Sequence, residues 1–332
     1  MNLKGVLWAV SLLVFSLAAY FAIPSLPLAK TSMPSASSIT RAVTKKVLAI
    51  ETPEGQGALV RRSIGSMSLR NLTPFLMLDH FHVKEGAFPD HPHRGQTTVT
   101  YMLEGSSEHE DSAGHKGTIE AGGVQWMVAG RGIMHAERPV HAADQPEPRG
   151  LQLWVNLPKK FKMVEPSYQE LGPEHIPTAF PQGPAAPVRV KVISGSSHGV
   201  DSPVRPLGGC WYLHYTFTQS QVSVFQDLPA GWTAFIYILK GSLIIGTDSI
   251  PHEHFHTLVL STNANETGVL LKSASEDTEF MLGAAEPIDE PIVQYGPFVM
   301  NTNEEIQQTL RDYREGRNGF ETAHTWKSKI FH

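Results

Sequence analysis

Two short motifs in the first half of the chain carry the residue types that bind metal ions. His91 and His93 lie two residues apart, and so do His135 and Glu137. Side chains at i and i+2 point to the same face of a β-strand, so each motif can aim two donors at one point. Three neutral imidazoles and one carboxylate suit Fe(II) or another late first-row divalent ion, and they leave coordination positions open for a substrate or dioxygen. The spacing therefore predicts a metal site in which all four residues are ligands.

The same four donors indicate the net charge of the site and the ions that it can hold. One carboxylate on a divalent ion leaves a net charge of +1, which favours an anionic ligand such as an enolate. Ligand sets of this type also accept manganese, nickel, copper or cobalt, according to supply. The single cysteine, Cys210, excludes an internal disulfide, a thiolate zinc site and a CxxC redox motif. The 16 histidines are thus the plentiful soft donors of the chain.

Composition indicates which elements position these donors. The 332 residues are enough for two domains and an appendage. With 28 Gly and 24 Pro, the chain favours a turn-rich β protein over a helical bundle. A net charge of −5 gives no support to a nucleic-acid surface read through phosphates, so no direct nucleic-acid partner is expected.

A repeated hairpin pattern predicts two related β units. VTYMLEG (99–105) places Val99, Tyr101 and Leu103 on one strand face before a turn, and FIYILKG (235–241) repeats the pattern 136 residues later. Near the carboxyl end, Thr302 and Glu305 form a capping box that starts an amphipathic helix. The resulting fold class is all-β, with a short C-terminal helix and an N-terminal hydrophobic helix.

The predicted domains follow the changes in composition along the chain. A proline-rich stretch separates the two β units, because each Pro lacks an N–H and disfavours helix before it. The predicted divisions are an N-terminal hydrophobic segment and linker over residues 1–45, a metal-binding unit over 46–165, a Pro-rich linker over 166–187, and a second unit without metal over 188–332 that includes helix 303–315.

Residues 5–23 are uncharged and almost wholly apolar, which predicts a membrane anchor. Nineteen helical residues span about 28 Å, close to the thickness of the hydrocarbon core. The excess of Lys and Arg after this stretch predicts that the globular part faces the cytosol. Two alternatives stay open: cleaved targeting to an organelle or the secretory route, and a cytoplasmic or nuclear protein without an anchor.

Four sequence blocks resemble the signature segments of the pirin family: HPHRGQTTVTYMLEG (91–105), HEDSAGHKGTIEAGGVQWMVAGRGIMHAERP (109–139), GLQLWVNLP (150–158) and GPFVMNTNEEI (296–306). The resemblance spans residues 50–332. It implies a bicupin, two jelly-roll β-barrels in tandem. In that family the amino-terminal cupin alone holds iron, through residues that match His91, His93, His135 and Glu137.

The resemblance implies two functions and leaves both open. The first is flavonol (quercetin) 2,3-dioxygenase activity, with a flavonol-like substrate and dioxygen as reactants. Here Glu137 is the catalytic residue, because it accepts the proton of the 3-hydroxyl group while the metal stabilises the enolate. The alternative is a non-enzymatic, iron-dependent redox sensor and transcriptional co-regulator that acts through protein partners. Two barrels in tandem can pair internally, so we expect a monomer.

Several other conspicuous residues have plausible structural roles. The cluster His252 to His256 aligns with a turn of the first unit, which predicts an exposed polar turn in a metal-free second barrel. Of Trp126 and Met127, we expect one in the core and the other at the cavity. Arg94 and Arg131 flank the ligand segments and either attract an anionic substrate or pair with acids. A further group either orients a ligand imidazole or belongs to a loop: His109, Glu110, Asp111 and His115.

Overall fold

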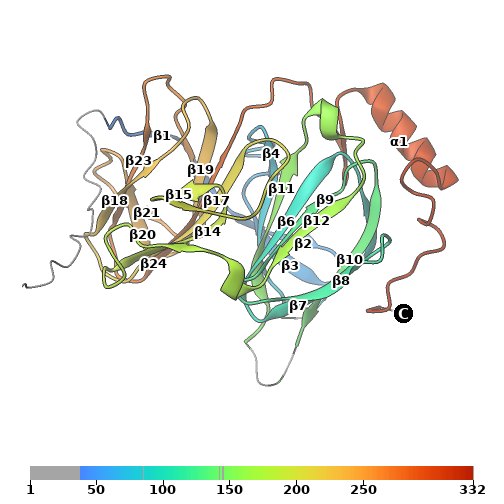
Figure 1. The fold of residues 1–332 in the computed structure, drawn as a ribbon, viewed down its shortest axis with the longest axis horizontal. Coiled ribbons are helices and arrows are strands. Elements are labelled where there is room, and N and C mark those ends of the chain that lie inside the picture. Colours follow the sequence, from blue (N-terminus) through green and yellow to red (C-terminus); the bar gives the residue numbers. More distant parts are fainter. Residues whose placement is uncertain (1–37, 85, 142, 144–145, 332) are drawn as a thin grey trace, which may run out of the picture. The chain divides into compact units, whose positions relative to one another are not determined.

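The computed structural model describes residues 38–331 except 85, 142, 144 and 145. These residues form a mostly β fold with two halves, seen at the two sides of Figure 1. Each half consists of a seven-stranded antiparallel sheet and a four-stranded antiparallel sheet. The described residues include one α-helix, α1 (Asn303–Glu315), and two short 3₁₀ helices, Lys159–Phe161 and Pro173–His175.

The first half contains the two predicted ligand motifs. Its seven-stranded sheet has the order β12 (Ser167–Leu171), β9 (Val124–Val128), β6 (Gln96–Glu104), β11 (Arg149–Asn156), β4 (Phe75–His82), β3 (Ala58–Arg62), β2 (Ile50–Glu54). Its four-stranded sheet has the order β5 (Phe88–His93), β10 (Ile133–Val140), β7 (Ser106–Asp111), β8 (Lys116–Glu120).

The second half repeats this arrangement. Its seven-stranded sheet has the order β1 (Val43–Leu48), β22 (His256–Leu260), β19 (Thr233–Lys240), β24 (Thr278–Ala285), β17 (Cys210–Phe217), β14 (Val188–Ser194), β13 (Thr178–Ala179). Its four-stranded sheet has the order β18 (Ser223–Asp227), β23 (Gly268–Ser273), β20 (Ser242–Ile245), β21 (His252–Glu253). Two small hairpins complete the described strands: β15 (Ser196–Ser197) with β16 (Val200–Asp201), and β25 (Val293–Tyr295) with β26 (Phe298–Met300).

The two seven-stranded sheets pack against each other in a shared core, which we call the seam. Strand alternation sends Val99 and Tyr101 of β6 into this core, where they meet Phe235 and Tyr237 of β19. Phe75 and Phe235 contact edge to face, with ring centroids 4.8 Å apart. The hairpin faces predicted from the repeat are therefore the faces that join the two halves.

Two reciprocal tyrosine–histidine pairs cross the seam. Tyr101 of the first half contacts Nδ1 of His214 with its hydroxyl at 3.0 Å. Tyr237, which occupies the same position in the repeated hairpin, contacts Nδ1 of His80 at 3.1 Å. These bonds give partners to polar groups that the packing of the two sheets buries.

The chain ends are exchanged between the halves. Strand β1 pairs with β22, so the first described strand completes the sheet of the second half. Helix α1 instead packs beside the first half (Figure 1), where Met134 of β10 lies in one apolar cluster with Ile306 and Phe320. The helix starts at the predicted capping box, in which Glu305 N–H donates to Thr302 Oγ1 at 3.2 Å. The predicted division into domains stays a prediction. Strand pairing shows one feature that this division did not include, the exchange of the chain ends between the halves.

Two predictions need correction. The halves are not closed barrels, because within the described strands the edges of the seven-stranded and four-stranded sheets do not pair with each other. Alternation and turn glycines specify antiparallel strands without specifying closure. The hydrophobic helix and membrane anchor predicted over residues 5–23 lie outside the described residues. No helix of the described part is long and apolar enough to cross a membrane, so the predicted membrane-anchored localisation is withdrawn.

Candidate metal centre

Strands β5 and β10 carry the two ligand motifs as antiparallel neighbours. His91 lies directly opposite His135 in the ladder, and the register shifts between His135 and Glu137. His93 lies on the same face of β5 as His91, since it is two residues further along. The pairing thus brings motifs that are 44 residues apart in the sequence to one place on the sheet.

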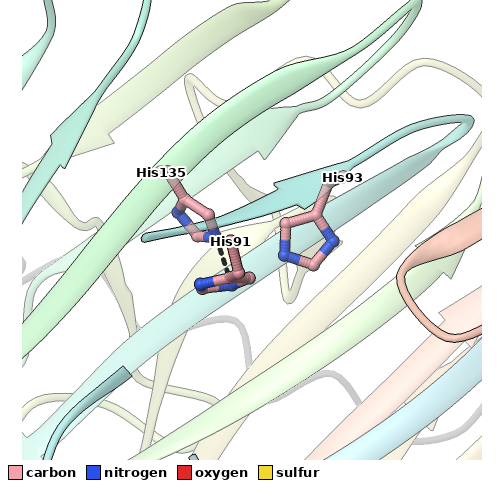
Figure 2. Close-up of side chains that lie close together, drawn as sticks. All are labelled: His91, His93 and His135. Atoms are coloured by element: carbon pink, nitrogen blue, oxygen red, sulfur yellow. Dashed lines mark hydrogen bonds between the residues drawn. The ribbon is translucent and has the colours of Figure 1, made fainter. Parts of the chain in front are cut away.

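The three imidazoles converge there, as Figure 2 shows. Their candidate ligand nitrogens all lie within 4.8 Å of one another. Nε2 of His135 lies 2.8 Å from Nε2 of His91, and the ring centroids of His91 and His93 are 4.9 Å apart. Two ring nitrogens at 2.8 Å repel through their lone pairs unless a hydrogen or a cation lies between them. This donor set fits a divalent ion.

Burial keeps two of these imidazoles neutral. His93 and His135 are 1% and 2% exposed. Burial holds the pKa of each well below its ordinary value, and the neighbouring His91 lowers both pKa values further. A neutral imidazole has a free lone pair, so both side chains are in the protonation state that a metal ligand requires.

Contacts on the far side of two rings fix their orientation. Nδ1 of His91 lies 2.8 Å from the carbonyl oxygen of Pro89 and donates its hydrogen to it, which leaves the lone pair on Nε2. The side-chain amide nitrogen of Gln96 lies 2.9 Å from Nδ1 of His93. In both rings the other nitrogen, Nε2, faces the cluster (Figure 2).

Glu137 lies on β10 beside the cluster without belonging to it. Its carboxylate is held by two donors: Thr100 Oγ1 donates to Oε1 at 2.8 Å, and Gln152 Nε2 donates to Oε2 at 3.1 Å. Both donors come from the seven-stranded sheet, from β6 and β11. Glu137 is 6% exposed and faces the same cavity as His91 and His93.

A cavity of about 610 Å³ adjoins these residues inside the first half. This volume lies in the range of small-molecule sites. Trp154 forms an aromatic wall, with its ring 5.0 Å from that of His93 and nearly perpendicular to it. Met77 and Phe81 add apolar surface. Arg62 also lines this cavity, where it donates to Asp79 Oδ1 at 2.7 Å and Oδ2 at 2.6 Å.

The remaining residues singled out in the sequence have structural partners. Trp126 and Met127 both lie in core clusters, so the prediction that one of them lines the cavity is wrong. Arg94 is buried and donates to Asp312 Oδ2 at 3.0 Å. Arg131 pairs with two carboxylates. These arginines therefore pair with acids rather than facing the cavity. The expectation of loop residues is wrong for His109, Glu110 and Asp111, which lie in β7 opposite the ligand strand β10. His109 pairs with Glu170 of β12, and His115 pairs with Asp111.

Comparison with known proteins agrees with the two-domain β fold. Residues 57–155 match the family model described as Pirin, and residues 212–319 match the model of the Pirin C-terminal cupin domain. A pirin-like protein of Solanum lycopersicum is 49% identical over 300 residues, covering 90% of this chain and 100% of that protein. Together these matches define a cupin-like protein of two domains. The chain belongs to the pirin family.

Solved structures extend the comparison. A quercetin 2,3-dioxygenase from Acinetobacter baumannii superposes with a TM-score of 0.76 at 29% identity, covering 85% of this chain and 99% of that one. The bacterial pirin YhhW from Escherichia coli, in complex with nickel(II), shares the fold with a TM-score of 0.55 at 18% identity, covering 74% of this chain and 99% of that one.

Proposed function

We propose that this pirin is a metal-dependent oxygenase of the flavonol 2,3-dioxygenase type, with Fe(II) as its ion. Manganese, nickel, copper and cobalt are the alternative ions. His91, His93, His135 and Glu137 would hold the ion. The observation that carries the proposal is the convergence of three imidazoles beside a cavity of about 610 Å³. The similarity to the A. baumannii quercetin 2,3-dioxygenase supports the reaction type.

The bound ion would lower the pKa of a coordinated hydroxyl group and make reaction with dioxygen accessible. The chain's own residues supply binding and proton transfer. Trp154 and Phe81 give a flat aromatic substrate apolar surfaces to contact. Glu137 accepts the hydroxyl proton at one of its carboxylate oxygens, and the bonds from Thr100 and Gln152 hold that carboxylate in place.

Oxygen consumption measured with a panel of flavonols, on protein of known metal content, tests this function. We expect uptake that depends on flavonol and rises in proportion to bound metal. The variant Glu137→Gln is expected to keep part of its metal and lose turnover, because the amide cannot accept the proton. Metal-replete protein that consumes no oxygen with any flavonol would exclude the enzyme.

A second candidate, a redox sensor acting through protein partners, is favoured by one specific contact. Arg94 follows His93 directly and is buried against helix α1, donating to Asp312 at 3.0 Å and to Thr309 Oγ1 at 3.1 Å. A change of charge at the ion thus has a short route to a helix at the protein surface. Hydrogen exchange in α1, compared between the Fe(II) and Fe(III) forms, tests this candidate. Equal protection in both forms would exclude it.

A further inference from the structure

A second cavity lies at the seam, on the opposite face of the seven-stranded sheet from the candidate metal centre. Its volume is about 710 Å³. Strand alternation separates the two sites, because Arg62 and Asp79 face the metal cavity while the adjacent Arg61 and His80 face the seam. Phe255 of the second half lines this space as well. We call this space the seam cavity.

Its walls carry guanidinium groups that are weakly engaged. Arg61 lies 3.5 Å from Glu51, and Arg149 lies 3.5 Å from Glu104. Both distances exceed the 2.7–2.9 Å that is typical of charge-assisted hydrogen bonds. Neither guanidinium makes a hydrogen bond to another described residue within the usual limits. Both retain N–H donors for a ligand.

The ladder places these cations around one buried histidine. Arg61 on β3 lies directly opposite His80 on β4, and Arg149 on β11 lies opposite His82, two residues further along β4. Directly opposite side chains are about 5 Å apart at Cβ and diagonal ones about 7–8 Å. One small anion can therefore contact both arginines and His80.

His80 itself has a polar atom without a partner. It is 8% exposed, and its Nδ1 contacts the Tyr237 hydroxyl at 3.1 Å. Its Nε2 is buried and has no hydrogen-bond partner among the described residues. With Tyr237 as the donor to Nδ1, the imidazole hydrogen lies on Nε2. Burial, Arg149 and Arg61 lower the pKa of His80 to about 3, so at neutral pH this group is an uncharged donor that requires an acceptor.

An aromatic ring faces the same space from the second half. Phe255, in the histidine-rich turn, adopts a left-handed backbone conformation with φ of 61°, which is costly for a bulky residue. Two backbone bonds hold it there: its N–H donates to Ile238 O at 2.8 Å, and its carbonyl oxygen accepts from Ala49 N–H at 2.8 Å. The guanidinium carbon of Arg61 lies 4.5 Å from the ring centroid. The strained turn thus presents an aromatic face beside the cations.

We propose that the seam cavity binds a small aromatic anion, an aryl carboxylate or aryl sulfonate. The anionic group is bound by Arg61, Arg149 and Nε2 of His80, and the ring packs against Phe255 and Leu239. This site is separate from the candidate metal centre and does not depend on the proposed oxygenase activity.

Calorimetric titration of the full chain with 2-naphthalenesulfonate tests the site. We expect saturable binding of one molecule per chain, and a loss of affinity of about tenfold or more in Arg149→Gln. The matched control is Arg138→Gln. Arg138 is also a partly exposed arginine paired with a glutamate, but it lies on β10 away from the seam. The control variant should bind as the original chain does. Binding should also shift the side-chain ¹⁵N signals of His80.

Further titrations locate the bound ligand and define its chemical class. His93→Ala should leave binding intact, because it changes only the metal cavity. The neutral 2-naphthalenemethanol and inorganic sulfate should each bind at least about tenfold more weakly than the aryl sulfonate. Unchanged affinity in Arg149→Gln, loss of binding in His93→Ala, or sulfate binding as tightly as the aryl sulfonate would overturn the proposal. The unfolding temperature of each variant verifies that it is folded.

Discussion

The two halves of this pirin share one arrangement of strands and differ in what fills it. Across the first four-stranded sheet, His91 pairs with His135. When the two halves are aligned by their hairpins, the pair in the second sheet that corresponds to His91 and His135 is Gln226 opposite Val269. Leu271 then stands where Glu137 stands in the first half. The second half therefore lacks, at the matching positions, the imidazole and carboxylate donors of the first.

The interior of the second half is packed instead with aromatic and aliphatic side chains. The rings of Tyr215 and Phe280 stack 4.9 Å apart, and Phe217 stacks on the same ring. Gln226 is satisfied locally, since Ser197 Oγ donates to its Oε1 at 2.7 Å. One sheet scaffold can thus hold either a polar cavity or a close-packed core, and a few inward-facing residues decide which.

The largest expected effect distinguishes the halves by their metal content. His93→Ala removes one of three converging imidazoles, so bound metal should fall from about one ion per chain to near zero. Elemental analysis after gel filtration measures this. The control is His252→Ala in the second half, which should leave metal content unchanged. An equal loss of metal in both variants would contradict the assignment of the site to the first half.

A second experiment transplants donors into the second half. Val269 and Leu271 are fully buried in an apolar cluster, and the double variant Val269→His, Leu271→Glu puts two polar groups, one of them ionisable as a carboxylate, into this close-packed core. We expect a loss of unfolding free energy of about 3 kcal/mol or more, without a second bound ion. Denaturant unfolding and elemental analysis report both quantities. A stable variant that binds two ions would show that core packing is not the reason why the second half lacks a metal site.

A smaller effect concerns the donors that hold Glu137. Thr100→Val keeps the shape of the side chain and removes the hydroxyl that donates to Glu137 Oε1. Loss of such a supporting bond typically weakens metal binding by about tenfold to 100-fold. Thr100→Ser should restore the original affinity, because it retains the hydroxyl. Competition with a metal chelator measures the difference. If valine and serine variants bind equally, the hydroxyl does not position the carboxylate.

The smallest expected effect is a pH dependence at the seam. The pKa of His80 is about 3 in the folded chain and near 6.5 when unfolded. The unfolded state therefore binds the extra proton between these values, and stability should decrease as pH falls from 6 to 4. The expected slope is about 1 kcal/mol per pH unit. His80→Gln should remove this slope, and His214→Gln controls for losing the reciprocal tyrosine bond. If the slope of stability against pH is unchanged in His80→Gln, a titrating group other than His80 causes it.

The sequence predicted local features well because they depend on residues near each other in the chain. The two-residue spacing brought His91 and His93 to one face, and the capping box at Thr302 set the start of the helix. Thr100 and Gln152, which hold Glu137, could not be identified, since they come from strands that become neighbours only in the folded sheet. The prediction that one of Trp126 and Met127 lines the cavity failed for the same reason, since both lie in core clusters.

The register shows why. Trp126 pairs with Val99, so it faces the seam, while Trp154 faces the cavity from a strand with a similar pattern of apolar residues. Strand alternation defines two faces without saying which one lies inside. Local sequence patterns likewise could not predict whether the sheets close or whether the chain ends are exchanged, because both depend on contacts between residues far apart in the sequence.

The exchanged ends bear on the order in which the protein can be made. Arg94, next to His93, finds its buried carboxylate partner 218 residues later, in Asp312. A ribosome must therefore synthesise nearly the whole polypeptide before this arginine can be neutralised. Contacts of such long range slow folding. The strand that carries His91 and His93 therefore gains its contact with α1 late in synthesis. An ion that binds the nascent chain would do so before this contact forms.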